Sequence, residues 1–430
     1  MGLIHEMKKT AKVHLAFEDI NTPYIMLEAI FASVLLQLTN PFYQLFATAM
    51  GADDVAVGLI SSLPSFCALF VLLPASLYID RIKDKKKFLM TVISICGIAL
   101  PVIAMSPFLG DRGYWFFIIG ISLWNIPYIM YTVSWQSYFN DLYLPSKRAV
   151  PYARRQMMTY AVPVVTIMLG GIILSYICKT TEQKILAYQI FFFLAFLASV
   201  AQRKMIAKTE YPEELNKDLG GSFSIKTLVS DFGTAIKNLK KYPQFCIFLI
   251  LLFIFYFGWQ MAWPMFFLYL VNGIGLNEFM KSSLDVISYL AQTMTSTWWG
   301  KRIEKRGAKE STIYGLLASA TVPAWIVMTD NFFVLVINYI FSGATGPGFQ
   351  LGLFNDMLDN LPDENRSLYI GVYNMVMQIS NFIAPLCGVA LYTRIGIRNT
   401  MIMSSCMRFF AACLFAVRYF VDRKKKEKIM

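Results

Sequence analysis

Long apolar segments constrain this chain more than any other feature of its sequence. A helix needs about 20 mostly apolar residues to cross the hydrocarbon core of a bilayer, and lipid offers no partners for backbone N–H and C=O groups, which leaves helices as the option at this length. Of the 430 residues, 57% are hydrophobic and 15% are charged, whereas a soluble domain has about 25% charged residues. We therefore predict an all-α membrane protein with twelve transmembrane helices. The predicted spans are 24–49, 54–79, 88–106, 114–137, 156–178, 184–203, 244–270, 278–299, 310–328, 332–357, 367–392 and 397–420.

The basic residues predict how these helices cross the membrane. The chain contains 39 Lys and Arg residues against 27 Asp and Glu residues, which gives a net charge of +12. Most of the basic residues lie in cytoplasmic segments if the N-terminus is inside the cell, and the positive-inside rule then places both termini in the cytoplasm. Basic residues beside anionic headgroups account for the positive charge, so a nucleic-acid partner is not predicted. We expect a multi-pass protein of the cell membrane, inner or plasma, that functions as a monomer.

The second half of the chain repeats the first half. Phe139-Asn140-Asp141 matches Phe354-Asn355-Asp356, and three prolines of the first half recur about 220 residues later. The matched prolines are Pro41 with Pro264, Pro127 with Pro347, and Pro163 with Pro385. Six helices return a chain to the same side of the membrane, so the two halves form parallel repeats. We predict six-helix bundles over residues 1–203 and 244–430, joined by a cytoplasmic linker over 204–243 that contains an amphipathic helix.

A charged loop follows the second helix of each half. Residues 78–88 read YIDRIKDKKKF, and residues 298–309 read WWGKRIEKRGAK. The residues that we predict to form a duplicated cytoplasmic gate are Asp80, Arg81, Lys85, Gly300, Glu304, Lys305, Gly307 and Lys309. Orientation alone explains the basic residues but not the acids among them.

These loops resemble the hallmark of the major facilitator superfamily, G-x-x-x-D-R-x-G-x-K/R after helix 2, with a less faithful copy after helix 8. The first copy has Ser76 and Lys83 where the family has glycine. The resemblance covers essentially the whole chain, and it implies two pseudo-symmetric bundles that transport a solute by alternating access. It also implies that the acid of the loop helps to latch the halves, and that residues 141–155 form the cytoplasmic link between helices 4 and 5.

Polar and aromatic side chains recur on single faces of several predicted helices. Polar groups that face lipid are costly, so these faces should contact protein or water. A single Asn or Gln can also simply join two helices. The resemblance makes helices 1, 4, 7 and 10 line the central path, which favours a substrate cavity. The candidate cavity residues are Gln37, Asn40, Gln44, Trp124, Asn125, Tyr128, Tyr131, Tyr256, Trp259, Gln260, Trp263, Gln292, Asn374, Gln378 and Asn381.

Tryptophans near helix ends and charges within the spans have competing interpretations. Trp135, Trp298 and Trp299 are expected to be interface anchors, as Trp often is at helix ends. Charged residues within spans are rare and are candidates for function. Asp285 either couples protons or pairs with a nearby donor, and Glu28, about one turn into its helix, is expected at the interface with proton coupling as the alternative. Arg408, in the middle of helix 12, is expected to form a structural ion pair or hydrogen bonds.

Enzymatic chemistry is not predicted. The chain has no G-x-x-x-x-G-K-[ST] loop for ATP, and its two histidines, His5 and His14, precede the first span, so no catalytic triad, metal or other cofactor is expected. The seven cysteines have no C-x-x-C pattern and are expected to pack as small apolar residues. Helix 10 contains SGATGPG, whose glycines and proline either bend the helix or let its neighbours approach closely. Helix 5 lacks the glycine that precedes Pro163 in antiporters of the family, so antiport is not supported.

The sequence therefore predicts a secondary or facilitative transporter for a small neutral or amphipathic organic solute, with protons as a candidate coupling ion. Two other functions remain open. One is translocation of a lipid or lipid-linked substrate, which needs a cavity open toward the bilayer. The other is a membrane sensor that kept the fold and lost transport.

Overall fold

The protein is helical wherever its structure is described. A computed structural model describes residues 2–79, 82, 84–143, 149–211, 233, 239–360 and 366–427, and within these ranges no strand occurs. Nine segments of the described chain are long and apolar enough to cross a membrane. One of them, Tyr369–Lys424, contains two predicted spans, separated at Gly396, whose φ of 80° is not helical. The all-α prediction is confirmed, and a helix lies over each of the twelve predicted spans.

The described residues of the first half form seven α-helices up to Lys208. They are α1 (Gly2–Gln37), α2 (Tyr43–Ala49), α3 (Asp54–Ile79), α4 (Lys85–Ala104), α5 (Gly113–Leu142), α6 (Ala149–Ile172) and α7 (Thr181–Lys208). Short 3-10 helices, η1 (Asn40–Phe42) and η2 (Ser106–Arg112), precede α2 and α5, and a π-helical turn, η3 (Ile173–Ile177), ends α6.

The second half begins with η5 (Leu239–Lys241). Its other elements are α9 (Pro243–Met261), α10 (Trp263–Phe267), the π-helical η6 (Leu268–Gly273), α11 (Glu278–Arg306), α12 (Ala308–Ile326), α13 (Phe332–Asn360) and α14 (Arg366–Glu427). α11 and α12 cover two predicted spans, although their composition does not place them among the nine membrane-capable segments. The amphipathic helix predicted within 204–243 lies almost entirely outside the described residues.

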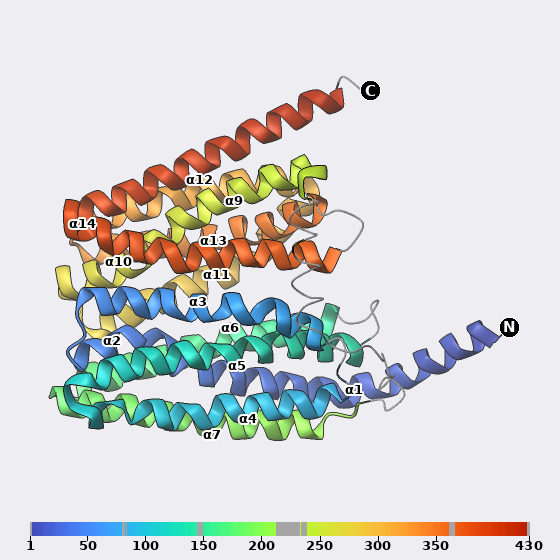
Figure 1. Ribbon diagram of the computed structural model, residues 1–430, viewed down its shortest axis with the longest axis horizontal. Helices are drawn as coiled ribbons and strands as arrows, with labels where there is room; N and C mark the ends of the chain where they lie inside the picture. The colour runs from blue at the N-terminus through green and yellow to red at the C-terminus, as the bar shows by residue number, and fades with distance from the viewer. Residues whose placement is uncertain are drawn as a thin grey trace. The chain divides into compact units, whose positions relative to one another are not determined.

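The contacts divide the chain into two compact units. The first unit comprises Met1–Gly51 and Phe70–Leu228, and the second comprises Ala52–Leu69 and Val229–Met430. In the first unit α1 packs against α6 and α7, and α4 packs against α5 and α7, as Figure 1 shows. In the second unit α14 packs against α9 and α12, and α13 packs against α11 and α12. The first part of α3 clusters with the second unit, whereas the sequence prediction assigned all of it to the first bundle.

The duplicated prolines of helices 1 and 7 coincide with breaks. Pro41 is the second residue of η1, which separates α1 from α2, and Pro264 is the second residue of α10, which follows the end of α9 at Met261. Proline lacks an N–H and its ring clashes with the preceding turn, which interrupts the helix. Both units thus contain one broken helix at a matched position.

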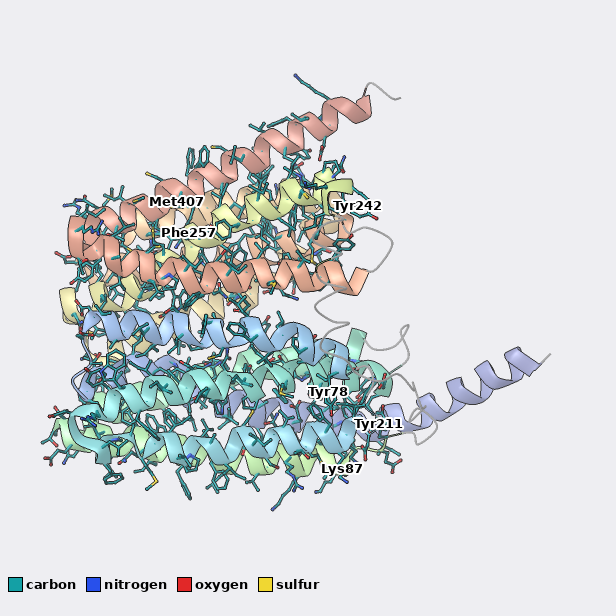
Figure 2. All side chains as sticks on the ribbon, in the orientation of Figure 1. Tyr78, Lys87, Tyr211, Tyr242, Phe257 and Met407 are labelled. Carbon is teal, nitrogen blue, oxygen red and sulfur yellow. The ribbon has the colours of Figure 1, made fainter. Side chains whose placement is uncertain are left out.

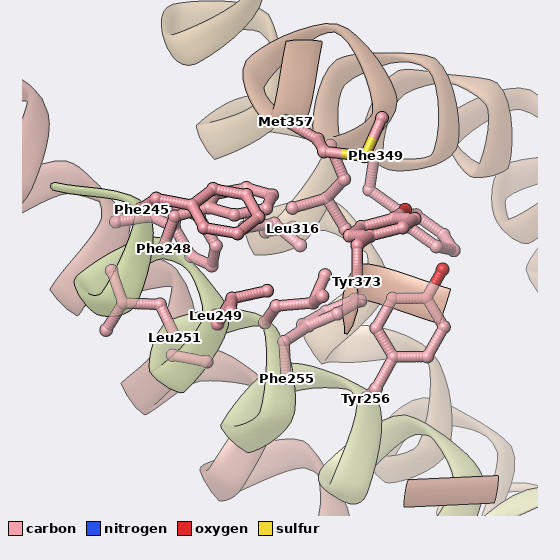
Figure 3. Packing of buried hydrophobic residues seen from close by; sticks show 14 of the residues in the cluster. Phe245, Phe248, Leu249, Leu251, Phe255, Tyr256, Leu316, Phe349, Met357 and Tyr373 are labelled. Atoms are coloured by element: carbon pink, nitrogen blue, oxygen red, sulfur yellow. The ribbon is translucent and has the colours of Figure 1, made fainter. Parts of the chain in front are cut away.

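Aromatic side chains fill the interior of each unit. In the first unit Phe46 packs against Phe117 and Tyr188, with ring centroids 5.0 and 5.1 Å away. In the second unit a hydrophobic cluster joins α9, α13 and α14 (Figure 3), and it includes Phe248, which stacks on Tyr373. These rings bury large apolar areas and favour offset or edge-to-face contacts, so they define how the helices pack.

The glycines of SGATGPG allow close approach rather than a break. α13 continues through Pro347. A Cβ atom on Gly343 would lie 2.3 Å from the Ser288 carbonyl oxygen of α11, and one on Gly348 would lie 2.6 Å from the Trp299 ring. Gly346 faces open space. The packing interpretation therefore accounts for two of these glycines.

Candidate functional site

A carboxylate is buried at the centre of the first unit. The Glu28 side chain on α1 is fully buried. Its Oε1 accepts a hydrogen bond from the Tyr131 hydroxyl on α5 at 2.7 Å and from Gln202 Nε2 on α7 at 2.9 Å, and its Oε2 accepts one from Arg155 Nε on α6 at 3.3 Å. One side chain thus joins four helices. The depth of Glu28 in the membrane stays a prediction, whereas its burial shows that the side chain points toward the other helices of the unit.

Arg155 completes this polar network from an unexpected position. Sequence reasoning assigned it to the cytoplasmic link, but α6 begins at Ala149 and carries it inward, where its side chain is 11% exposed. Its guanidinium carbon lies 3.6 Å from the centroid of the Trp135 ring, a cation–π contact. Trp135 is buried, so its assignment as an interface anchor is wrong. Its indole Nε1 is buried and has no hydrogen-bond partner among the described residues.

Predicted cavity residues continue from this network along α5. Tyr128 lies 5.9 Å from Tyr131, centroid to centroid, and stacks on Trp124 at 5.0 Å with an interplanar angle of 13°. The Trp124 indole N–H donates to the Cys96 carbonyl at 2.8 Å, which fixes the ring. Asn125, beside them on α5, is half-buried. The aromatic stripe is therefore a packed ladder that ends at Glu28.

The polar stripe predicted on helix 1 does not remain on one helical face. Gln37 is the last residue of α1, Asn40 is exposed in η1, and Gln44 is half-buried in α2. The break at Pro41 interrupts the helical spacing on which the prediction depended. The structure brings none of the three into a described hydrogen bond with the Glu28 network.

The repeat provides an internal comparison for the charged network. With the offsets of the matched prolines, Glu28 corresponds to Leu251, Tyr131 to Leu351, and Arg155 to Met377. The backbone arrangement is duplicated, but the charges and the hydroxyl are replaced by apolar side chains in the second unit. The second bundle therefore packs without an ion pair at the positions that match Glu28 and Arg155.

Aromatic rings gather in the second unit about two turns further along α9 than Leu251, beside the break between α9 and α10. Trp259, in the last turn of α9, lies 5.6 Å from Tyr256, 5.8 Å from Trp263 and 5.5 Å from Phe349 between ring centroids. Tyr256 is buried, whereas Trp263 is 50% exposed. The Trp259 ring lies at 60° to 88° to the planes of these three rings, and Gln260, next to Trp259 in the sequence, is half-buried.

Amides on α14 supply the polar groups of this unit. Asn374, Gln378 and Asn381 are half-buried, and Asn381 Nδ2 donates to Gln378 Oε1 at 3.4 Å. The Asn381 Oδ1 atom is buried and has no partner among the described residues. Figure 3 shows Tyr256 and Tyr373, from α9 and α14, in the same cluster. The second unit thus combines aromatic faces with amide groups near the break.

Asp285 has a local partner. Its Oδ2 lies 2.6 Å from Lys281 Nζ, one turn earlier on α11, and both side chains are partly exposed. Gln292, two turns further along α11, is half-buried, and its carbonyl accepts from the Ser296 hydroxyl. Pairing with a nearby donor, one of the two interpretations of Asp285, is confirmed.

The first charged loop is partly described. Asp80, Arg81 and Lys83 lie outside the described residues. Asp84 caps α4 by accepting from the Lys87 N–H, and Lys85 Nζ lies 2.7 Å from the Asp141 carboxylate of α5.

A tyrosine at the start of the linker joins this charged cluster. The Tyr211 hydroxyl donates to the same Asp141 oxygen at 2.7 Å, and its ring stacks on Tyr138. Figure 2 shows Tyr211 at the same end of the unit as Lys87 and Tyr78. Burial, and then the hydrogen bond to Asp141, raise the pKa of the Tyr211 hydroxyl. This end of the first unit is held by a network that the sequence did not predict in full.

The second loop copy is closed by a glycine and by ion pairs. Gly307, with φ of 86°, ends α11 in a conformation that side chains rarely adopt. Lys309 Nζ pairs with Asp422 of α14 at 2.5 Å, and Asp356 forms a two-pronged ion pair with Arg418. Gly300 faces open space, Lys305 is exposed, and the placement of the Glu304 side chain lies outside what the structure describes.

The remaining tryptophans divide between the two interpretations. Trp299 is buried and donates from Nε1 to the Ala344 carbonyl at 2.8 Å, so its assignment as an interface anchor is wrong. Trp298 is 56% exposed, as an anchor should be.

A match to a protein-family model identifies the family of this chain. The model described as Major Facilitator Superfamily matches residues 25–255 and again residues 248–429. The chain belongs to the major facilitator superfamily. The double match covers both halves of the chain, as the internal repeat predicts. The membership confirms the predicted fold and makes this a multi-pass membrane protein of a transporter family.

Solved structures of this superfamily are similar in fold. A mutant of the nucleoside transporter NupG matches with a TM-score of 0.70 and 13% identity, over 92% of this chain and 99% of that chain. A bacterial homologue of the human lysosomal transporter Spinster, inward-facing and unoccupied, has a TM-score of 0.62 at 14% identity, covering 94% and 96% of the two chains. The xylose transporter XylE from E. coli, partially occluded and inward-open, has a TM-score of 0.62 at 11% identity, covering 93% and 96%. No curated protein sequence matches this chain.

Sequence reasoning missed two members of the Glu28 network. Arg155 and Gln202 stand at the ends of their predicted spans, where basic and polar residues usually mark the membrane boundary. An alignment of the two halves could have pointed to Arg155. It places Leu251 opposite Glu28 and Met377 opposite Arg155, so the charged pair occurs in the first half and not at the matched positions of the second. Residues that serve only to pack the bundle should recur in both halves, whereas residues found in one half are candidates for a role of their own.

Proposed function

We propose that this protein moves a small neutral or amphipathic organic solute across the membrane by alternating access, and that proton binding at Glu28 couples to that movement. The observation that carries the proposal is the four-helix network around Glu28, which has no counterpart at the matched positions of the second unit. Intramembrane charges are costly to keep and mark functional sites by default. A purely structural role would be expected in both halves of a duplicated fold.

The network suits proton coupling because one proton alters all of its contacts. Ionised Glu28 attracts Arg155 and accepts from Tyr131 and Gln202. A protonated carboxyl loses the ionic attraction and becomes a donor, so its three partner groups must rearrange. Since Glu28 lies on α1 and its partners lie on α5, α6 and α7, proton binding changes how four helices hold together.

The chemistry of the second unit indicates the class of solute. Trp259, Tyr256 and Trp263 offer aromatic faces, and Gln378 and Asn381 offer amide donors and acceptors. A molecule with a flat ring and several hydroxyl or amide groups fits this set better than an ion or a plain hydrocarbon. Nucleosides meet that description, and NupG, a nucleoside transporter, is among the similar folds.

Uptake into liposomes tests the proposal. Purified protein is reconstituted, preloaded with unlabelled uridine, and supplied with radioactive uridine, with protein-free liposomes as the blank. We expect saturable counterflow, which Trp259→Ala reduces and Trp298→Ala, at an exposed position, leaves unchanged. Parallel assays use xylose, a dipeptide and a fluorescent phospholipid. Translocation of the phospholipid alone would favour the lipid-handling alternative, and saturable binding without any flux would favour a sensor.

A further inference from the structure

Arg408 is a buried cation without a carboxylate partner. It lies in the second helical part of α14, after the break at Gly396, and its side chain is among the largest fully buried side chains, 1% exposed. Within the described residues it forms no ion pair. Its guanidinium donates instead to three backbone carbonyl oxygens: Nη1 to Ser319 at 3.1 Å, Nη2 to Trp259 at 3.1 Å, and Nε to Gly258 at 3.4 Å.

Two of these carbonyls belong to the broken end of α9. Gly258 and Trp259 are in the last turn of α9, which ends at Met261. The last four carbonyl groups of a helix lack intrahelical donors, and the aligned peptide dipoles give this end a partial negative charge. Ser404, one turn before Arg408, donates a second hydrogen bond to the Gly258 oxygen at 2.6 Å. A cation and a hydroxyl from α14 therefore satisfy a helix end inside the membrane-spanning part of the unit.

The third carbonyl has lost its donor for a different reason. In an α-helix the N–H of residue 323 would bond to the oxygen of residue 319, but residue 323 of α12 is proline and has no N–H. Arg408 supplies the missing donor to Ser319. The neighbouring Ala324 N–H bonds across to the Ser405 hydroxyl of α14. The planar guanidinium, with donors in a fixed fork, can reach three carbonyls on two helices at once.

The absence of a side chain at Gly258 helps the backbones of α9 and α14 to approach closely enough for these bonds. A Cβ atom there would lie 3.0 Å from Met407 Cβ and 3.3 Å from the Arg408 nitrogen. Figure 2 labels Phe257 and Met407 where α9 and α14 pass each other. The close crossing and the three carbonyl contacts thus form one packed assembly.

We propose that Arg408 is a positioning residue that fixes the break between α9 and α10 and so orients the aromatic groups beside it. Its Nη2 holds the carbonyl of Trp259, whose ring contacts Tyr256 and Trp263. The side chains that we assign to solute binding therefore take their direction from a cation on another helix. The inference about solute binding rests on the proposed function, whereas the inference about the geometry of the break does not.

Fluorine NMR on protein labelled with 5-fluorotryptophan tests the geometry without any solute. The chain has eight tryptophans, and Trp→Phe substitutions at 259, 263 and 124 assign three of the resonances. In Arg408→Met, which keeps length and removes every donor, we expect the resonances of Trp259 and Trp263 to move or broaden. The resonance of Trp124, bonded to Cys96 in the first unit, should stay in place and report folded protein.

Ser405→Ala is the matched control. It removes a buried polar contact of α14 that goes only to α12, so the resonances of Trp259 and Trp263 should stay close to their original positions. Unmoved resonances in folded Arg408→Met, or equal movement in Ser405→Ala, would overturn the proposal.

If Arg408→Met does not fold, a second variant, Arg408→Lys, still tests the proposal. Arg408→Lys keeps the charge, but an ammonium group lacks the planar fork, so the two resonances should shift by less than in Arg408→Met yet measurably; unchanged positions would again overturn the proposal. If uridine counterflow is observed, Arg408→Met should raise KM more than it lowers the maximal rate, because it misplaces a binding group. Failure of counterflow in the unmodified protein would refute the uridine hypothesis and leave the spectra valid.

Discussion

Replacing Glu28 by glutamine should destabilise the protein by about 3 kcal/mol, because breaking a buried ion pair leaves an uncompensated charge and typically costs 3–5 kcal/mol. The Arg155 Nε and Glu28 Oε2 atoms are 3.3 Å apart, with side chains 11% and 0% exposed. At an effective dielectric of about 20, that separation corresponds to a gross attraction of about 5 kcal/mol. Glutamine keeps an acceptor for Tyr131, which places the expected cost at the lower end of the range.

Unfolding by SDS in mixed micelles, followed by fluorescence, measures this difference. Glu310→Gln is the control, because Glu310, like Glu28, pairs with arginine (Arg302 and Arg306), but at a partly exposed site. Exposed pairs contribute at most about 1 kcal/mol. The double variant Glu28→Gln/Arg155→Gln should be more stable than the sum of its single changes implies, by about 2 kcal/mol. A cost for Glu28→Gln no larger than that for Glu310→Gln would refute the reasoning.

Five further variants, one of them compared with the unmodified protein in a pH titration, probe the rest of the structure. Gly307→Ala should lower the free energy of unfolding by about 1 to 2 kcal/mol, because φ of 86° is strained for alanine, whereas Gly300→Ala, in an open helical position, should be neutral or stabilising by up to about 1 kcal/mol. Gly343→Ala should lower the free energy of unfolding by about 1 to 3 kcal/mol through overpacking, and Gly346→Ala, which faces open space, should not. The same unfolding assay measures the Gly307/Gly300 pair and the Gly343/Gly346 pair. Equal effects within either pair would contradict the geometry. The raised pKa of the Tyr211 hydroxyl favours its neutral form, so the contribution of Tyr211 to stability is complete below pH 10 and is lost as the pH rises further. A Tyr211→Phe variant should therefore lose less stability above pH 10 than the unmodified protein. Parallel curves of stability against pH for the two proteins would contradict this.

The fold was predictable because the strongest signals were long and repeated. Apolar runs of about 20 residues predict helices wherever they occur, and the matched prolines predicted a repeat, of which the structure shows one sign in the helix breaks beside Pro41 and Pro264. Gly307 was identified from the sequence as part of the second charged loop, and the structure places it at the end of α11 with a positive φ. Features encoded by local composition and spacing were therefore within reach of the sequence.

The contents of the candidate site were harder to predict because they depend on distant partners. Glu28 seemed interfacial from its depth, yet its partners lie more than 100 residues away in the chain. For Arg408 the sequence predicted an ion pair or hydrogen bonds, and the structure shows hydrogen bonds to carbonyl groups left without donors by a helix end and by Pro323, which the sequence did not identify. Hydrophobic periodicity says which face of a helix is buried, and it does not say which polar atoms meet there.

Gradient-driven accumulation of uridine in proteoliposomes tests the central claim most directly. With the pH lower on the side from which uridine enters, the unmodified protein should accumulate uridine above the external concentration and lose this accumulation when an ionophore collapses the gradient. Folded Glu28→Gln protein should still exchange uridine by counterflow but should not accumulate it, because exchange does not require net proton movement. Accumulation by Glu28→Gln equal to that of the unmodified protein would contradict the assignment of Glu28 as the coupling group.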